Sequence, residues 1–211
     1  MSRYRRELFP ISIFHSSVED NQKLKNLILP YIESCKDKLS SSSPEGWLTT
    51  NIITSFENDQ LNRIFFDDGE ISNEVRGQYI NVLKTFFDQN WETDIDSMWF
   101  NYYDNGQYQE AHTHMGDYNK PIHFACVHFL SYDSSVHSPL TFTDPLSRIR
   151  TTSIEFKSSK YGEKCSVKAK EGDLIMFPCY LEHEVKSGPP TPNNPRVTIS
   201  FNVRVLKYGD E

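Results

Sequence analysis

The second half of the chain contains a series of short segments rich in β-branched and aromatic residues, and this pattern limits the possible folds most strongly. The segments are residues 97–103, 122–131, 140–143, 151–156, 165–169, 173–178 and 196–205. Turn signals such as Asp104-Asn105-Gly106 and Glu171-Gly172 lie between them. Short strands at such spacing are typical of a β-sandwich or a β-barrel. We therefore predict a mainly β core over residues 96–211.

The first part of the chain has a different, helical periodicity. Residues 18–35 and 71–90 carry apolar side chains three and four positions apart, as on one face of a helix. These side chains are Leu24, Leu27, Ile28, Tyr31 and Ile32 in the first segment, and Val75, Tyr79, Val82, Leu83, Phe86 and Phe87 in the second. We predict that residues 1–95 form a mainly helical flank packed on one sheet. A length of 211 residues suits a single domain spanning 1–211.

Charge and cysteine usage exclude several classes of protein. The formal net charge of -7 argues against a broadly basic protein that binds nucleic acid or a membrane surface. It does not exclude a substrate that is a single nucleotide base flipped into a pocket. The four cysteines form no CxxC pair, which argues against a zinc ribbon. The basic residues near Met1 precede no apolar stretch, so we predict no secretory signal and a cytoplasmic, thiol-reduced protein.

The last β segment, residues 196–205, shows clean period-two alternation. Its odd positions are Val197, Ile199, Phe201, Val203 and Val205, and its even positions are Arg196, Thr198, Ser200, Asn202 and Arg204. Alternate residues of a strand point to opposite faces of the sheet. The polar face is therefore either exposed to solvent or turned into the barrel, where it lines a site for a charged ligand. The alternation alone does not decide between the two.

Three histidines have the spacing of a metal site. His112 and His114 lie two residues apart, and on a strand such residues share a face. His183 follows a Gly-Asp turn and the apolar segment 174–178. Two strand histidines and a distal one recur as a way to hold iron with open coordination positions. By contrast, His123 and His128 lie five apart and face opposite ways, so we expect packed or surface residues there.

Two segments resemble the prolyl 4-hydroxylase-like oxygenases, which use iron(II) and 2-oxoglutarate (2OG) on a double-stranded β-helix, a jelly-roll or cupin-like fold. Residues 103–114, with Tyr103, Gly106 and the HxH pair, resemble the tyrosine, glycine-turn and HxD region of that family. Residues 170–198, with the Gly-Asp turn, His183 and a basic residue 13 positions later at Arg196, resemble its closing half.

The whole chain is similar to a group of 2OG/iron oxygenases from bacterial and phage sequences. That group opens with a Leu-Phe-Pro element, here residues 8–10, and carries a Gly-Trp, here Gly46-Trp47. It has HxH in place of HxD, and it ends with an Arg-x-x-x-Ser-Phe-Asn segment, here residues 196–202. This resemblance covers nearly the full length and implies an Fe(II)- and 2OG-dependent dioxygenase, most often a hydroxylase.

The resemblance also implies which residues carry the chemistry. The metal ligands, and hence the catalytic residues, are His112, His114 and His183. The cosubstrate-binding residues are Arg196, Tyr103, Thr198 and Asn202. The planar guanidinium fork of Arg196 suits the distal carboxylate of 2OG. The cosubstrates are then 2OG and O2, with ascorbate as an optional accessory. The primary substrate, a peptide or a metabolite, is not indicated.

One departure from the family pattern concerns the third metal ligand. The usual set has two histidines and a carboxylate, and the carboxylate position falls on His114. Either His114 ligates and gives a three-histidine site, or Glu110 or Asp117 supplies the carboxylate, or the site is altered. Glu110 shares a strand face with His112, so it is geometrically acceptable.

Two other functions compete with the oxygenase hypothesis. The first is a cupin-like three-histidine metalloenzyme that uses no 2OG. The second is a jelly-roll binding module. An active site predicts that Arg196 points inward and lies near the histidines, whereas a binding module predicts that it points to solvent.

Overall fold

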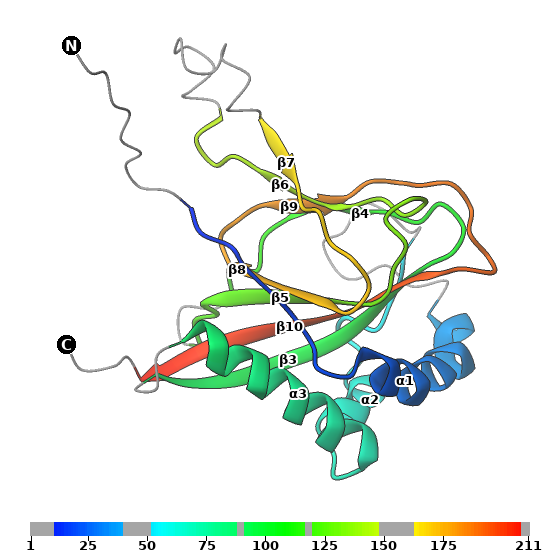
Figure 1. Ribbon diagram of the computed structural model, residues 1–211, viewed down its shortest axis with the longest axis horizontal. Coiled ribbons are helices and arrows are strands. Elements are labelled where there is room, and N and C mark those ends of the chain that lie inside the picture. The colour runs from blue at the N-terminus through cyan, green and yellow to red at the C-terminus, as the bar shows by residue number, and fades with distance from the viewer. Residues whose placement is uncertain (1–10, 40–51, 88–90, 117–119, 148–162, 208–211) are drawn as a thin grey trace.

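The computed structural model describes residues 11–39, 52–87, 91–116, 120–147 and 163–207, and its core is a pair of facing antiparallel sheets (Figure 1). The larger sheet has the strand order β1-β8-β5-β10-β3-β2, and the smaller has the order β4-β9-β6-β7. The strands are β1 (Phe14–Ser17), β2 (Ile53–Thr54), β3 (Glu92–Tyr103), β4 (Gln109–His112), β5 (Phe124–Ser131), β6 (Leu140–Thr143), β7 (Lys164–Ser166), β8 (Asp173–Pro178), β9 (His183–Val185) and β10 (Arg196–Lys207). This architecture confirms the predicted double-stranded β-helix core.

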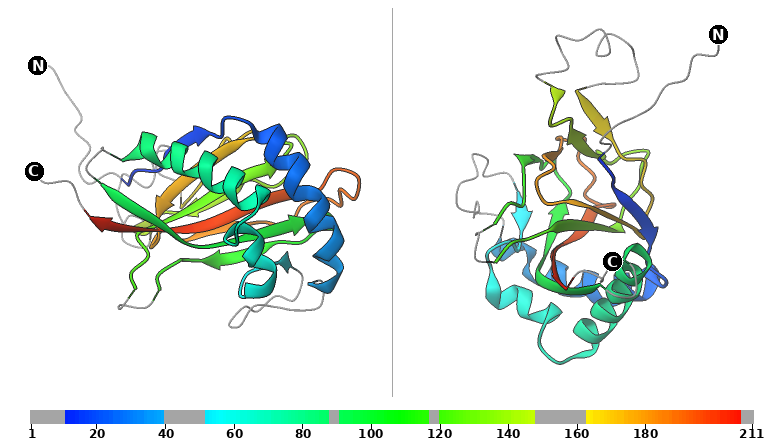
Figure 2. Two further views of the ribbon diagram at one scale, coloured as in Figure 1. Left: turned by 90° about the horizontal axis from the view of Figure 1, so that it is seen from below. Right: turned by 90° about the vertical axis from the view of Figure 1, so that its left-hand side faces the viewer.

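The helices cover the outer face of the larger sheet, as Figures 1 and 2 show from three directions. They are α1 (Asn21–Cys35), η1 (Lys36–Lys38), α2 (Asp59–Asn62), η2 (Arg63–Phe65) and α3 (Glu70–Phe86). The Asp20 side chain caps α1 by accepting a hydrogen bond from the backbone N–H of Lys23. The predicted apolar stripes are the buried faces, which pack against the sheet. None of the described helices is long and apolar enough to cross a bilayer.

Two hydrophobic clusters lie on opposite sides of the larger sheet. One fills the space between the sheet and the helices and contains Tyr79, which stacks on Phe201 with ring centroids 4.7 Å apart. The other lies between the two sheets and contains Phe129, Phe142 and Phe177. The larger sheet is therefore buried on both faces over much of its area, so its strands have no solvated face there.

Strand β10 occupies the middle of the larger sheet, between β5 and β3, and its two faces differ as the alternation predicts. Its odd residues, such as Ile199 and Phe201, belong to the helix-side cluster. On the opposite face Arg196, Thr198 and Ser200 are only 3%, 1% and 5% exposed. The polar face is thus turned into the barrel, as expected for a strand that lines a site.

Several details differ from the sequence prediction. The first 95 residues also contribute the short edge strands β1 and β2, which pair with β8 and β3. Helix α3 ends at Phe86, because Phe87 has an extended backbone. The strand expected at 165–169 is found at Lys164–Ser166. The strand predicted at 151–156 and the motifs at 8–10 and 46–47 lie outside the described residues.

The Gly-Asp turn before β8 requires glycine. Gly172 has φ +86°, a left-handed conformation in which a side chain is strained. A Cβ at this position would also lie 3.2 Å from the Cβ of Asn21, at the start of α1. The Gly172 N–H donates to the carbonyl of Phe129, and its carbonyl accepts from the N–H of Val18. This turn therefore connects α1 to the larger sheet just before the segment that leads to His183.

Candidate active site

The three predicted histidines meet at one point of the smaller sheet. His112 ends β4 and lies directly opposite His183, the first residue of β9, in the antiparallel pair. His114 lies two residues beyond the end of β4, and its backbone N–H donates to the carbonyl of Cys179 at 2.8 Å. The ring centroids are 4.2 Å apart for His112 and His183, 5.0 Å for His114 and His183, and 5.3 Å for His112 and His114. One ligand atom of each ring lies within 4.8 Å of the others.

Hydrogen bonds at Nδ1 place the lone pair of each ring on the same nitrogen, Nε2. Nδ1 of His112 lies 2.7 Å from the carbonyl of Glu110, and Nδ1 of His183 lies 3.0 Å from the carbonyl of Leu181. Nδ1 of His114 lies 2.7 Å from Oδ1 of Asn202. Because these partners only accept, each Nδ1 carries the proton and each Nε2 carries the lone pair. That tautomer is the one in which an imidazole binds a metal through Nε2.

Burial keeps all three imidazoles neutral at pH 7. It lowers the pKa of His114 to about 4, with the neighbouring His112 as a further cause, against the opposing effect of the Asn202 hydrogen bond. Burial also lowers the pKa of His183 well below its usual value, and it lowers that of His112. Metal binding requires the neutral form of histidine. No proton therefore has to be displaced at pH 7 before a metal binds.

Glu110 and Asp117 are the two carboxylates that could replace His114 as the third metal ligand. Among the described residues, the convergent group of metal-type side chains consists of His112, His114 and His183, without Glu110. Glu110 contributes its backbone carbonyl to His112 instead. Asp117 lies outside the described residues.

Arg196 points into the barrel and is buried without a carboxylate beside it among the described residues. Its guanidinium carbon lies 4.6 Å from the ring centroid of Tyr103, 5.6 Å from that of Phe129 and 5.9 Å from that of Tyr132. Its Nε and Nη1 atoms are buried and have no hydrogen-bond partner within the described part of the chain. A buried cation without an anionic partner is costly. These open donors suit a ligand carboxylate, to which a guanidinium donates strong charge-assisted hydrogen bonds.

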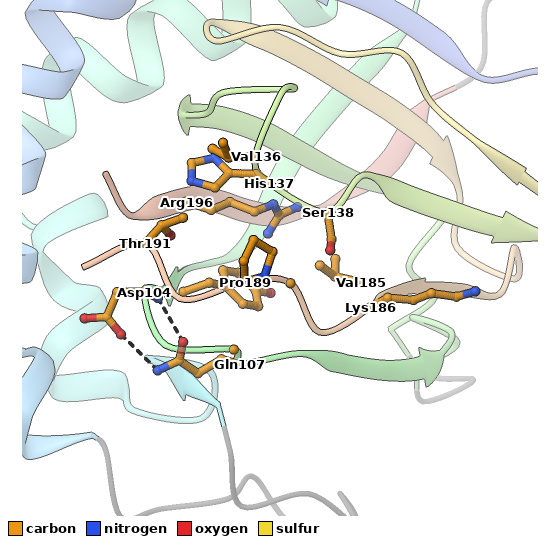
Figure 3. A pocket seen from close by; sticks show the side chains of 13 residues that line it. Asp104, Gln107, Val136, His137, Ser138, Val185, Lys186, Pro189, Thr191 and Arg196 are labelled. Atoms are coloured by element: carbon orange, nitrogen blue, oxygen red, sulfur yellow. Dashed lines mark hydrogen bonds between the residues drawn. The ribbon is translucent and has the colours of Figure 1, made fainter. Parts of the chain in front are cut away.

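A small cavity of ≈ 20 Å³ adjoins Arg196, and Figure 3 shows the arrangement of its walls. Three loop segments form these walls, residues 104–107, 136–138 and 186–191. The side chain of Gln107 holds the first segment by accepting from the N–H of Asp104 and donating to its carboxylate. His137 joins the other two sides, because its Nδ1 accepts from the N–H of Asp133 and its Nε2 donates to the carbonyl of Asn194.

Gln109 connects the Arg196 region to the histidines, and the sequence interpretation missed it. The Tyr103 hydroxyl donates to Oε1 of Gln109 over 3.3 Å, and Nε2 of Gln109 lies 3.4 Å from Nε2 of His112. Contacts through Tyr103 and Gln109 therefore link the guanidinium of Arg196 to His112. Because β4 pairs irregularly with β9 between Gln109 and His112, these side chains meet at a spacing of three residues. No sequence pattern indicates this irregularity.

The other predicted cosubstrate residues fall into two places. Thr198 lies next to Arg196 on the inner face of β10, where Nδ2 of Asn101 donates to its hydroxyl over 3.5 Å and to that of Ser200 over 3.1 Å. Asn202 is placed at the histidines instead, where it accepts the hydrogen bond from His114. The structure therefore gives Asn202 a partner that the sequence interpretation did not assign.

Trp99 is a further missed residue of the site. Its ring stacks on His114 with centroids 5.7 Å apart and an interplanar angle of 26°. It lies on the same face of β3 as Ser97, Asn101 and Tyr103, and this two-residue spacing is the signal that could have identified it. His128, by contrast, is a packed residue as predicted: it is buried and its Nδ1 lies 2.8 Å from the hydroxyl of Tyr79.

Comparisons with known proteins agree with this description. The family model described as "Putative 2OG-Fe(II) oxygenase" matches residues 97–202, which is half of the chain. A search of curated proteins found no match.

Several solved structures share the fold. The viral collagen prolyl hydroxylase vCPH of Paramecium bursaria Chlorella virus-1, in complex with 2OG, is 12% identical with a TM-score of 0.54, covering 92% of this chain and 96% of its own. EctD from S. alaskensis, with 2OG and 5-hydroxyectoine, is 12% identical with a TM-score of 0.55, covering 93% and 73%. HygX from Streptomyces hygroscopicus, with nickel and 2OG bound, is 8% identical with a TM-score of 0.58, covering 94% and 85%.

Proposed function

The chain belongs to the 2OG-Fe(II) oxygenase family, and from this premise we propose that His112, His114 and His183 hold its Fe(II) and that Arg196 anchors 2OG. The protein is thus an Fe(II)- and 2OG-dependent oxygenase with O2 as the other cosubstrate. When bound, the iron supplies the redox chemistry that couples the conversion of 2OG and O2 to succinate and CO2 with the insertion of one oxygen atom into a substrate C–H bond.

The observation that carries this proposal is the presence, on the inner walls of one barrel, of three neutral imidazoles and a buried guanidinium whose Nε and Nη1 have no hydrogen-bond partner among the described residues. The Nε2 lone pairs suit a divalent first-row metal, for which imidazole is a favourable ligand. The open Nε and Nη1 donors of Arg196 suit the 5-carboxylate of 2OG. Both halves of the site therefore fit the groups that the family uses, and Gln109 lies between them.

The residues around Arg196 have separate roles in this proposal. Tyr103, Phe129 and Tyr132 hold the guanidinium between their rings and keep water away from it. Thr198 offers a hydroxyl on the same strand face, two residues along. Removing water strengthens the attraction between the guanidinium and a carboxylate, because the local dielectric is low.

We further propose three neutral ligands for the iron site. Compared with a two-histidine, one-carboxylate set, this donor set leaves the metal centre one positive unit higher. The doubly charged 2OG then supplies the negative charge near the metal.

The chain itself offers a matched pair of variants to test the cosubstrate assignment. Arg196 and Arg204 are on the same face of β10, but Arg204 is paired with Asp94 at 2.9 Å and Asp96 at 3.2 Å. We expect Arg196→Gln to raise the KM for 2OG by about 10–150-fold, because a charge-assisted pair contributes about 1.5–3 kcal/mol. Arg204→Gln should leave that KM unchanged. Steady-state succinate release measures both, and equal KM values in all three proteins would refute the assignment.

Within the family we propose a hydroxylase of the prolyl 4-hydroxylase-like kind. The motif from Tyr103 to His114 supports this subtype, and the fold is shared with vCPH. Peptides with and without proline, free amino acids and other small metabolites are the panel that tests it, scored by substrate-stimulated succinate release. Stimulation by proline-containing peptides supports the subtype, and stimulation by another class alone would exclude it.

A further inference from the structure

The three histidines of the site are not held in the same way. His112 and His183 each donate from Nδ1 to a backbone carbonyl two residues earlier in the chain, at Glu110 and Leu181. His114 donates to a side chain, Asn202, which lies on β10, 88 residues away in the sequence. Its orientation therefore depends on one replaceable group, whereas the other two depend on the main chain.

The amide of Asn202 is itself fixed. Its Nδ2 donates to Oγ of Ser97 on the neighbouring strand β3, at 3.0 Å. Strands β3 and β10 pair directly, with Asn202 opposite Ser97 in the register. The amide is thus held between a hydroxyl on one side and an imidazole on the other, and its oxygen faces the ring.

Packing alone does not determine which ring atoms of His114 face the other histidines. Trp99 stacks on the ring, and the edge contact with Phe177 has centroids 6.3 Å apart at 85°. These aromatic contacts confine the ring plane, but a half-turn of the ring about the Cβ–Cγ bond keeps that plane and exchanges nitrogen for carbon positions at almost no cost in packing. The flipped ring would present a C–H group to the other two histidines. Among the described residues, the polar contact that distinguishes the two orientations is the hydrogen bond from Nδ1 to Asn202.

We propose that Asn202 is the positioning residue of His114: its amide oxygen selects the ring orientation and the Nδ1-protonated tautomer that present Nε2 to the metal. This inference rests on the proposed function, because it takes His114 as an iron ligand. It replaces the sequence-based role of Asn202 in 2OG binding with a role at the metal.

A neutral amide at this place also determines how strongly His114 donates electrons to the metal. Metal-bound histidines usually donate their second N–H to a carboxylate, a carbonyl or water, and an anionic partner raises the basicity of the ligand. The neutral amide of Asn202 leaves His114 a weaker donor than a carboxylate would. An aspartate has the shape of asparagine and adds that charge, whereas a leucine has a similar volume and accepts no hydrogen bond.

The test measures metal binding without turnover. Co(II) is added to the metal-free full chain in competition with a chelating indicator, and the visible ligand-field spectrum of the bound Co(II) is recorded. We expect Asn202→Leu to weaken Co(II) binding by about 10–100-fold, the usual effect of losing such a partner, and to change the spectrum. Asn202→Asp should restore tight binding and shift the Fe(III)/Fe(II) potential downward. Arg204→Gln, two residues along the same face, should match the wild type in affinity and spectrum.

The outcomes separate this inference from the proposed function. If the wild type binds Co(II), His183→Ala abolishes binding and Asn202→Leu leaves affinity and spectrum unchanged, the inference is wrong and the metal site stands. If neither the wild type nor any variant binds Co(II), both fail. Thermal unfolding of the metal-free proteins controls for folding. A loss of affinity in Asn202→Leu at an unchanged midpoint, reversed in Asn202→Asp, is the result that we expect.

Discussion

At the scale of single residues, two arginines on one strand face show what distinguishes a site from a stabilising ion pair. Arg204 is partly exposed and is neutralised by two aspartates. Arg196 is 3% exposed, is surrounded by aromatic rings and faces no carboxylate among the described residues. Burying a cation in this way costs stability unless a partner compensates for it. We propose that the carboxylate of a bound ligand is the partner that offsets this cost.

A substitution of Arg196 by an apolar residue should have opposite effects on stability and on function. Arg196→Met replaces the cation with an apolar side chain of similar length, so the 2OG-free protein should become more stable, by about 1–4 kcal/mol. The same variant should lose the stabilisation that 2OG gives to the metal-loaded wild type. Urea unfolding with and without 2OG measures both effects. A variant that is less stable than the wild type, yet still stabilised by 2OG, would contradict this view of Arg196.

At the scale of elements, β10 shows how far the sequence leads and where it stops. The period-two alternation predicted a strand with one polar face, but only the flanking strands β5 and β3 and the helix layer determine that this face points inward. The two long helices were predicted from their apolar stripes, because such stripes depend on neighbours three and four residues apart. The three-residue strand β9 was not predicted, because it is stabilised by pairing with the distant strands β4 and β6.

The residues of the candidate site, like the elements of the fold, could be predicted from the sequence only in part. The histidines were identified from their residue type and spacing, and Arg196 from the resemblance of residues 170–198 to the oxygenase family. Gln109 was not identified, because it reaches His112 through irregular strand pairing, and the partner of Asn202 depends on how β10 lies relative to the smaller sheet. Contacts that depend on long-range register leave no local pattern in the sequence.

The two faces of β10 predict different consequences for neighbouring substitutions. Phe201 stacks on Tyr79 of α3 and is fully buried, so Phe201→Ala should cost about 3–5 kcal/mol of unfolding free energy through lost packing and a cavity. Ser200 accepts one hydrogen bond from Asn101, so Ser200→Ala should cost about 1 kcal/mol. Chemical denaturation compares them, and equal losses would contradict the two-faced role of β10.

At the scale of the whole molecule, the chain is acidic, but the interior of its barrel suits an anionic ligand. The net charge of -7 gives no indication of the ligand, since the site is formed by neutral imidazoles and one buried guanidinium. The same interior also keeps histidines uncharged. Burial lowers the pKa of His128 to about 3, with the charge of Asp173 opposing this effect.

The depressed histidine pKa values predict how stability depends on pH. Between pH 6.5 and about 4 the unfolded chain binds protons at these histidines while the folded chain does not, so the unfolding free energy falls as the pH falls and is level above pH 6.5. His128 alone should account for about 2 kcal/mol between pH 7 and pH 5.

Urea unfolding of the metal-free protein at several pH values measures this dependence. His128→Gln keeps an acceptor for Tyr79 but does not titrate, so its stability should vary less with pH than that of the wild type. Identical pH slopes for the two proteins would show that His128 is not responsible.

The most direct test of the account is an anaerobic titration of the Fe(II)-loaded protein with 2OG, followed by visible absorption. We predict a metal-to-ligand charge-transfer band that saturates at one equivalent in the wild type and in Arg204→Gln. The band should be absent in His183→Ala and require far more 2OG in Arg196→Gln. The account is contradicted if the wild type shows no band, or if the band forms equally well in all four proteins.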